Sequence, residues 1–131
     1  KPHMPQMDQA RRLDDIVLCV MIEKEEAMDH IEAICSIPGV DMVQFGPSDY
    51  SMSAGKNRSD YAEECKAAER KMIEVALKHG VAPRCEIPTP EAAEYYVKLG
   101  VRHFSLGDQL KVLKDFWINS GEKIRAIADA T

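Results

Sequence analysis

The hydrophobic positions along the chain form four short runs, and each run is followed by a longer segment with helical spacing. The runs cover residues 16–22, 40–45, 81–85 and 103–106. The first is continuous and rich in β-branched residues, which is typical of a strand covered on both faces. The third is the weakest, because Pro83 cannot donate a hydrogen bond to a neighbouring strand. The pattern predicts four β-strands.

Between these runs, apolar side chains recur every three or four residues, which predicts helices. We expect helices over residues 25–36, about 59–79, 89–100 and about 108–129, the last with a break near residues 119–121. Thr89 is the expected N-cap of the third helix, and Pro90 its first residue. Residues 1–15 contain two prolines and mixed charges and predict a linker or a connecting helix.

The predicted order, strand and helix four times over, implies parallel strands joined by right-handed crossovers. Two architectures fit this order: a small open α/β sheet, or half of an eight-fold barrel. A complete (β/α)₈ barrel needs roughly 250 residues, and the chain has 131. We therefore expect residues 1–131 to form one partial domain, in which residues 16–131 supply four βα units.

Composition narrows the class of protein. The chain has 17 Lys+Arg against 22 Asp+Glu, a net charge of −5 and 45% hydrophobic residues, which is typical of a soluble globular domain. The acidic excess argues against a nucleic-acid-binding surface, and no apolar run approaches the roughly 20 residues of a membrane span. The scattered cysteines predict reduced, buried thiols and a cytoplasmic protein; they are Cys19, Cys35, Cys65 and Cys85.

Two carboxylates follow neighbouring predicted strands. Glu23 comes directly after the first strand, and Asp49 comes shortly after the second. In parallel α/β folds the carboxyl ends of the strands carry the chemistry, so the two side chains are expected to converge. Converging carboxylates repel each other unless they share a proton or a cation, and Mg²⁺ suits such a pair. Alternatively, Glu23 pairs with Lys24 or an arginine and Asp49 closes an Asx turn.

The segment Gly46-Pro47-Ser48-Asp49 follows the second predicted strand. Gly46 permits a close approach of the backbone, and Pro47 fixes one dihedral angle. The next two N–H groups are then free to bind an anion. The alternative is a plain turn that caps the next segment.

Three segments together resemble the HpcH/HpaI aldolase family: Ile22–Ala27, Ile37–Asp41 and Phe45–Ser51, followed by Gly55. The resemblance covers essentially the whole chain as the C-terminal half of a (β/α)₈ TIM barrel. It implies a class II, metal-dependent aldolase, a carbon–carbon lyase that cleaves 4-hydroxy-2-oxo acids. The products are pyruvate and an aldehyde, formed through a metal-stabilised enolate.

The resemblance also assigns roles to residues. Glu23 and Asp49 match the two carboxylate ligands of a divalent cation, Mg²⁺, Mn²⁺ or Co²⁺. The backbone N–H groups of Ser48 and Asp49 match those that hold the substrate carboxylate, within the segment formed with Gly46 and Pro47. Tyr50 stands where the family commonly has Leu, and we expect it to reshape the aldehyde end of the pocket.

The family's catalytic His and Arg belong to the N-terminal half of the barrel, and no motif for either occurs here. None of the four histidines is a good substitute; they are His3, His30, His79 and His103. Arg84, Glu86 and Asp108 lie in or after the later strands and are weaker candidates for the site. We therefore expect a missing N-terminal half-barrel or companion chain as partner, and a homo-oligomer. The alternatives are a citrate lyase β-type or malyl-CoA-type lyase, and a non-catalytic half-barrel interaction subunit.

Overall fold

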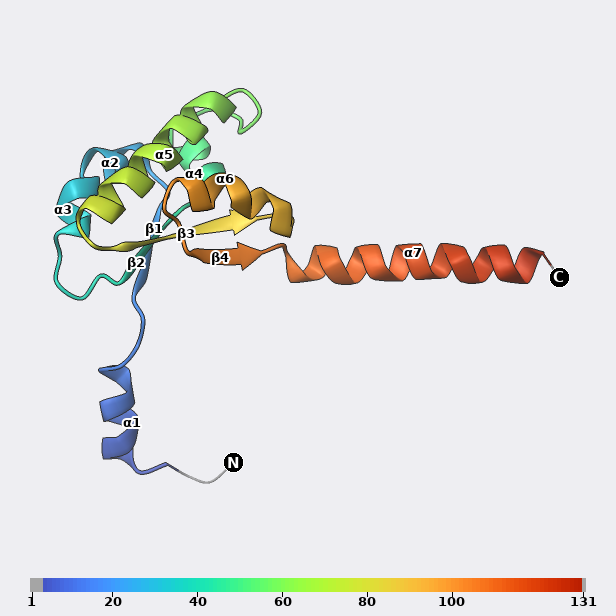
Figure 1. Cartoon of the computed structure of the whole chain (residues 1–131), viewed down its shortest axis with the longest axis horizontal. Helices are drawn as coiled ribbons and strands as arrows, with labels where there is room; N and C mark the ends of the chain where they lie inside the picture. The colour runs from blue at the N-terminus through green and yellow to red at the C-terminus, as the bar shows by residue number, and fades with distance from the viewer. Residues whose placement is uncertain (1–3, 131) are drawn as a thin grey trace.

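The computed structural model describes residues 4–130 and contains one parallel sheet of four strands. The strands are β1 (Cys19–Ile22), β2 (Met42–Phe45), β3 (Ala82–Ile87) and β4 (His103–Leu106), and they lie in this order across the sheet (Figure 1). Residue partners such as Ile22 with Phe45 and Ile87 with Leu106 place the carboxyl ends of the strands at one edge. The predicted parallel α/β fold with four strands is confirmed.

Two strand boundaries differ from the prediction. Residues 16–18 lie outside β1 and are exposed, although the backbone N–H of Leu18 donates to Asp41 Oδ2 at 2.8 Å. β3 ends two residues later than expected, because its pairing with β4 continues to Ile87. This pairing begins at Arg84, one residue after Pro83. Pro83 therefore interrupts only the first part of the strand.

The helices alternate with the strands along the chain. The predicted helix over residues 25–36 is divided at His30, and the third helix begins as a short 3₁₀ turn. The break expected near residues 119–121 is absent, and a helix directly after β2 was not predicted. The helical segments are α1 (Gln6–Leu13), α2 (Glu25–Asp29), α3 (Ile31–Cys35), α4 (Pro47–Ser53), α5 (Ala62–Lys78), η1 (Pro90–Ala92), α6 (Ala93–Lys98) and α7 (Gln109–Asp129).

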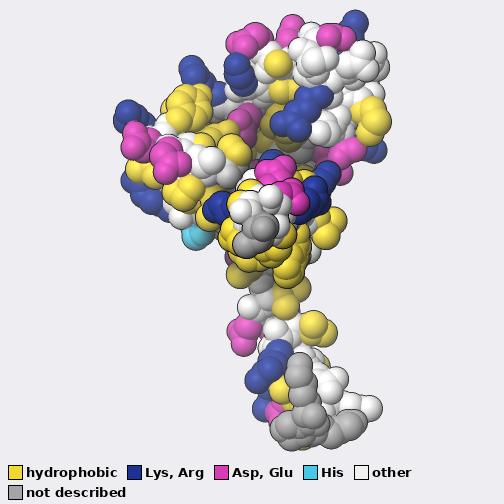
Figure 2. Space-filling view, turned by 90° about the vertical axis from the view of Figure 1, so that its right-hand side faces the viewer, with side chains coloured by type: hydrophobic (Ala, Val, Ile, Leu, Met, Phe, Trp, Pro, Cys, Tyr) yellow, Lys and Arg dark blue, Asp and Glu magenta, His cyan; other side chains and the backbone are white. Residues whose placement is uncertain are grey.

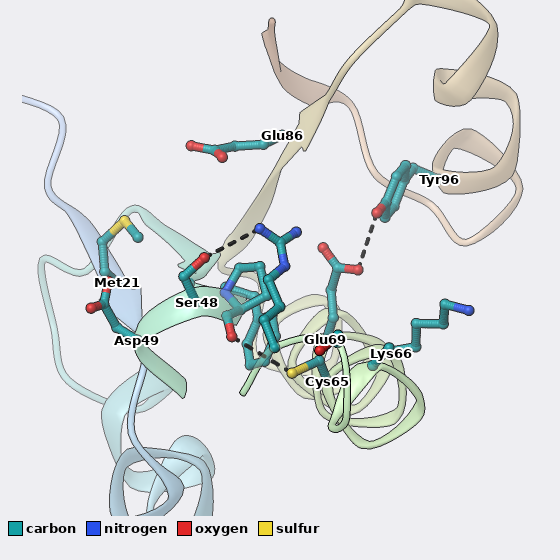
Figure 3. Close-up of a pocket in the computed structure, with 14 residues that line it drawn as sticks. Met21, Ser48, Asp49, Cys65, Lys66, Glu69, Glu86 and Tyr96 are labelled. Atoms are coloured by element: carbon teal, nitrogen blue, oxygen red, sulfur yellow. Dashed lines mark hydrogen bonds between the residues drawn. The ribbon is translucent and has the colours of Figure 1, made fainter. Parts of the chain in front are cut away.

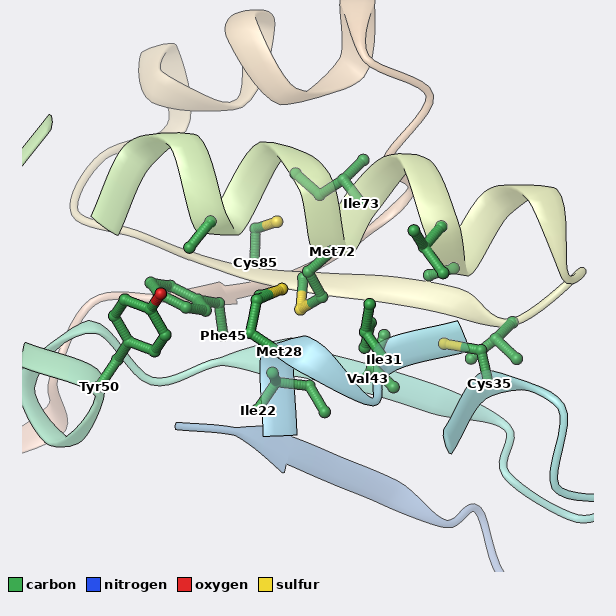
Figure 4. Close-up of a cluster of buried hydrophobic side chains, with 14 of the residues drawn as sticks. Ile22, Met28, Ile31, Cys35, Val43, Phe45, Tyr50, Met72, Ile73 and Cys85 are labelled. Carbon is green, nitrogen blue, oxygen red and sulfur yellow. The ribbon is translucent and has the colours of Figure 1, made fainter. Parts of the chain in front are cut away.

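The core lies between the sheet and the helices that cover one of its faces, chiefly α5 (Figure 4). Ile22, Val43 and Cys85 point from the strands towards this layer, and Met72 and Ile73 of α5 meet them. All five side chains are buried. The apolar face predicted for α5 is thus confirmed as the face that packs on the sheet.

The opposite face of the sheet is covered by no helix among residues 4–130. Met21 on β1 is 43% exposed, so the expectation of a strand covered on both faces was wrong. Polar side chains hold this surface together: Gln44 Nε2 donates to Glu86 Oε1 at 2.9 Å, and Arg84 Nη1 donates to Gln44 Oε1. Gln44 is only 2% exposed, so the side chain at the centre of this network is buried.

Two helices extend away from the sheet with their apolar side chains exposed. Figure 1 shows α1 and α7 leading away from the body in different directions, and neither helix contains a buried residue. Figure 2, which looks along α7, shows hydrophobic side chains gathered around this helix. They include Leu110, Leu113, Phe116, Trp117, Ile124 and Ile127, each more than half exposed. None of the helices within residues 4–130 has the length and apolarity of a bilayer crossing.

Candidate active site

Glu23 lies at the carboxyl edge of the sheet, directly against Gly46. A Cβ atom at Gly46 would lie 2.9 Å from Glu23 Cβ and 3.0 Å from Glu23 Oε2. The backbones are held in this position because the Gly46 N–H donates to the Ile22 carbonyl at 3.0 Å. The absence of a side chain at Gly46 therefore leaves the space that the Glu23 carboxylate occupies.

Asp49 lies in the first turn of α4, three residues after Gly46. Pro47 occupies the first position of this helix, where the missing N–H costs nothing. The first hydrogen bond along the helix runs from the Tyr50 N–H to the Gly46 carbonyl at 2.9 Å. The N–H groups of Ser48 and Asp49 precede it and have no carbonyl partner one turn back. The predicted anion-binding segment is therefore the start of a helix rather than a loop.

A pocket of about 690 Å³ opens beside this segment (Figure 3). Asp49 and Ser48 line one side of it, with Met21 of β1 and Glu86 of β3 nearby. The other side is formed by side chains of α5 and α6 and of the segment that precedes α5. These are Arg58, Ser59, Ala62, Cys65, Lys66, Glu69 and Tyr96.

None of these lining residues was predicted as part of the site. Arg58 Nη1 donates to Ser48 Oγ at 3.2 Å, and the Tyr96 hydroxyl donates to Glu69 Oε2 at 3.0 Å. Burial raises the pKa of Glu69, although the Tyr96 hydrogen bond and the charge of Arg58 oppose the shift. Glu69 could have been found, because it lies among apolar residues on the buried face of α5. Arg58 lies in an irregular segment, which gives no periodic signal.

The pocket does not favour covalent catalysis by its own nucleophiles. Burial raises the pKa of Cys65, so this thiol stays neutral near pH 7. Its Sγ donates to the Pro47 carbonyl at 3.6 Å. The hydrogen bond from Lys66 to Glu63 raises the pKa of Lys66, whereas a Schiff-base lysine needs a lowered pKa.

Two expectations about side chains near the site were wrong. Tyr50 is buried, with its ring 5.0 Å from Phe45 and 6.1 Å from Tyr61, and does not line the pocket (Figure 4). It belongs to the core rather than to the aldehyde end of the site. Met21, within the run expected to form a strand covered on both faces, lines the pocket instead.

The remaining candidate residues are Asp108, Glu86 and the histidines. Asp108 caps α7, accepting from the Lys111 N–H at 2.8 Å, and Glu86 is held by Gln44 at the pocket. His3 lies outside the described residues, and His30 and His103 are exposed. His79 follows α5, with Nδ1 3.3 Å from Ser36 Oγ. None of the three described histidines lines the pocket.

The donor set is consistent with a hard divalent cation. Glu23 and Asp49 offer carboxylate oxygens at the same edge of the sheet, and a Mg²⁺ site usually takes one or two carboxylates plus water and substrate oxygens. Within residues 4–130, no group of three His, Cys, Asp or Glu side chains has a metal-binding arrangement. A closed structural site is therefore not formed by these residues, and an open site with two protein ligands fits.

Comparison with known proteins decides the family. Residues 3–115 match the sequence model of the HpcH/HpaI aldolase/citrate lyase family. The chain belongs to this family. It is 30% identical over 100 residues to the 5-keto-4-deoxy-D-glucarate aldolase of Klebsiella pneumoniae, covering 76% of this chain and 39% of that protein. It is 32% identical over 94 residues to the 4-hydroxy-2-oxo-heptane-1,7-dioate aldolase of Escherichia coli, covering 72% of this chain and 36% of that protein.

Solved structures of HpcH/HpaI proteins share the fold. The HpcH/HpaI aldolase of Desulfitobacterium hafniense superposes with a TM-score of 0.76 at 22% identity, covering 95% of this chain and 49% of that one. A family member from Burkholderia cenocepacia gives a TM-score of 0.74 at 22% identity, covering 86% of this chain and 44% of that one. The chain thus spans about half the length of these proteins, and less of the curated relatives. The likeness to these structures shows that the chain shares their fold over about half of their length.

Proposed function

We propose that this chain is the C-terminal half of a (β/α)₈ barrel and part of a class II pyruvate aldolase. The observation that carries the proposal is the packing of Glu23 against Gly46, beside the helix start that holds Asp49. The four parallel strands, with one face uncovered, suit half of a barrel whose other half supplies the remaining strands. The free cysteines suit a reducing compartment such as the cytoplasm.

In this proposal each part of the site has one task. Glu23 and Asp49 hold a divalent cation, Mg²⁺, Mn²⁺ or Co²⁺. When bound, the cation would supply Lewis-acid stabilisation of negative charge on the keto oxygen of a 4-hydroxy-2-oxo acid. The N–H groups of Ser48 and Asp49 bind the substrate carboxylate and fix the orientation of the carbon–carbon bond that breaks to give pyruvate and an aldehyde. The half of the barrel outside this chain supplies the proton-transfer group.

The proposal is tested by aldol cleavage in the assembled enzyme. We expect release of pyruvate from 4-hydroxy-2-oxo acids, loss of activity after removal of metal by a chelator, and recovery on addition of Mg²⁺, Mn²⁺ or Co²⁺. Borohydride added with pyruvate should leave the activity unchanged, because Lys66 is protonated and paired with Glu63. Activity that survives complete metal removal, or inactivation by borohydride, would exclude the class II assignment.

We further propose that α7 packs against a second copy of the chain in a homo-oligomer. More than half of each large apolar side chain named above on α7 is exposed, and single copies rarely leave such a continuous patch in water. Phe116 and Trp117 lie edge to face with their ring centroids 5.3 Å apart, which gives the helix a rigid aromatic anchor.

A charge on the apolar face of α7 should break this association. We expect Trp117→Glu to lower the fraction of oligomer at micromolar concentration by at least about tenfold, since a buried aromatic anchor typically contributes 2 kcal/mol or more. Asn119→Glu adds the same charge at a polar, exposed position of the same helix and serves as the control. Sedimentation velocity measures both variants, and an unchanged mass distribution for Trp117→Glu would refute the role of α7.

A further inference from the structure

Arg58 lies ten residues after Ser48 and reaches the carboxyl edge of the sheet. It lies in the segment between α4 and α5, and its Nη1 donates to Ser48 Oγ at 3.2 Å (Figure 3). It lines the pocket that contains Gly46 and Asp49, and also the neighbouring pocket formed by the ends of β3 and β4. The guanidinium therefore lies directly over the helix start.

Arg58 forms no ion pair with the residues that the structure describes. Among residues 4–130, no carboxylate oxygen lies within 4.0 Å of its guanidinium, and the ion pairs in this part of the chain are made by Arg11, Lys66, Lys78 and Lys111. Glu69 experiences its field, but Glu69 Oε2 is bonded to Tyr96. A guanidinium has five N–H donors in a planar fork, so one bond to Ser48 leaves most of them available.

In this pocket, Arg58 supplies the positive charge that an anionic ligand needs. Asp49, Glu69 and Glu86 all line the pocket, and the ammonium of Lys66 is bound to Glu63. An organic carboxylate entering this pocket meets several carboxylates of the chain and one uncommitted guanidinium. Arginine binds carboxylates through two parallel hydrogen bonds, which fixes their plane as well as their position.

We propose that Arg58 is a substrate-binding residue that anchors the carboxylate of the oxo acid together with the N–H groups of Ser48 and Asp49. This inference rests on the proposed function, since it names a further group for the same substrate. It predicts that side-chain charge from the segment before α5, and not the backbone alone, determines the affinity for pyruvate.

The inference is tested by pyruvate binding to the assembled enzyme in the presence of Mg²⁺, measured by calorimetry together with KM and kcat in the aldol direction. We expect Arg58→Gln to weaken pyruvate binding by about 10- to 100-fold, the usual contribution of a charge-assisted hydrogen bond. Affinity for Mg²⁺ should change by less than about twofold, because Arg58 is not among the proposed ligands. Arg58→Lys, which keeps the charge but loses the fork, should recover part of the affinity.

Two controls separate ligand binding from a structural role. Arg70→Gln removes an exposed guanidinium of α5 that donates to the Tyr95 hydroxyl at 2.9 Å outside this pocket, and should leave pyruvate affinity unchanged. Ser48→Ala removes the bond to Arg58 but keeps the charge, and should cost much less than Arg58→Gln. Equal losses in Ser48→Ala and Arg58→Gln, or wild-type affinity in Arg58→Gln, would overturn the inference. A wild-type enzyme that binds neither Mg²⁺ nor pyruvate would instead refute the proposed function.

Discussion

Conversion of either site carboxylate to its amide should abolish most of the aldolase activity. We expect Glu23→Gln and Asp49→Asn each to lower kcat/KM for aldol cleavage by about 1,000-fold or more. A metal Lewis acid contributes several kcal/mol of transition-state stabilisation, and about 1.4 kcal/mol corresponds to a factor of ten in rate. Glu23 and Asp49 are the two proposed protein ligands, so loss of one removes half of the proposed ligand set.

The same variants should lose metal affinity without losing the fold. Titration with Mn²⁺ followed by electron paramagnetic resonance measures the affinity, and circular dichroism measures the helix content. Glu26→Gln is the matched control, because Glu26 lies only three residues from Glu23 and is exposed on α2. If both site variants bind Mn²⁺ as tightly as the wild type, Glu23 and Asp49 are not the ligands.

The fold was largely predictable because buried and exposed positions alternate with different periods in strands and helices. The face of α5 that includes Cys65, Met72 and Ile73 follows the helical period, and the structure buries all three. The continuous run at residues 16–22 was misleading, because continuous hydrophobicity does not say how many residues pair. Only Cys19–Ile22 form β1, and the apolar residues before them remain exposed.

The site was predictable only where its residues are close in sequence to a strand end. Glu23 and the segment from Gly46 to Asp49 satisfy this condition, whereas Arg58 approaches from nine residues beyond Asp49 through an irregular segment. Tyr50 shows the converse error, because its place where the resembled family commonly has Leu suggested a position at the pocket. Successive side chains of a helix point about 100° apart. The side chain of Tyr50, next to Asp49, therefore points into the core.

Adding a single methyl group at Gly46 should separate the geometry of the site from its chemistry. We expect Gly46→Ala to weaken metal affinity and to lower kcat/KM by about 100-fold, the typical cost of a displacement of about 1 Å in a catalytic group. The backbone angles of Gly46, φ −109° and ψ 85°, do not require glycine. The cost arises because the new Cβ would lie 2.9 Å from Glu23 Cβ and 3.1 Å from Met21 Cε. Met21 is free to move aside, but Glu23 Cβ moves only with its backbone.

Gly121→Ala is the matched control for this prediction. Gly121 lies within α7, and a Cβ there would meet no atom within 4 Å. The same substitution at this position should stabilise the helix by up to about 1 kcal/mol and leave metal binding unchanged. Wild-type metal affinity and activity in Gly46→Ala would mean that the position of the Glu23 carboxylate does not depend on the gap at Gly46. A loss confined to metal binding and activity, with an unchanged thermal transition, would identify the gap at Gly46 as the feature that positions the Glu23 carboxylate.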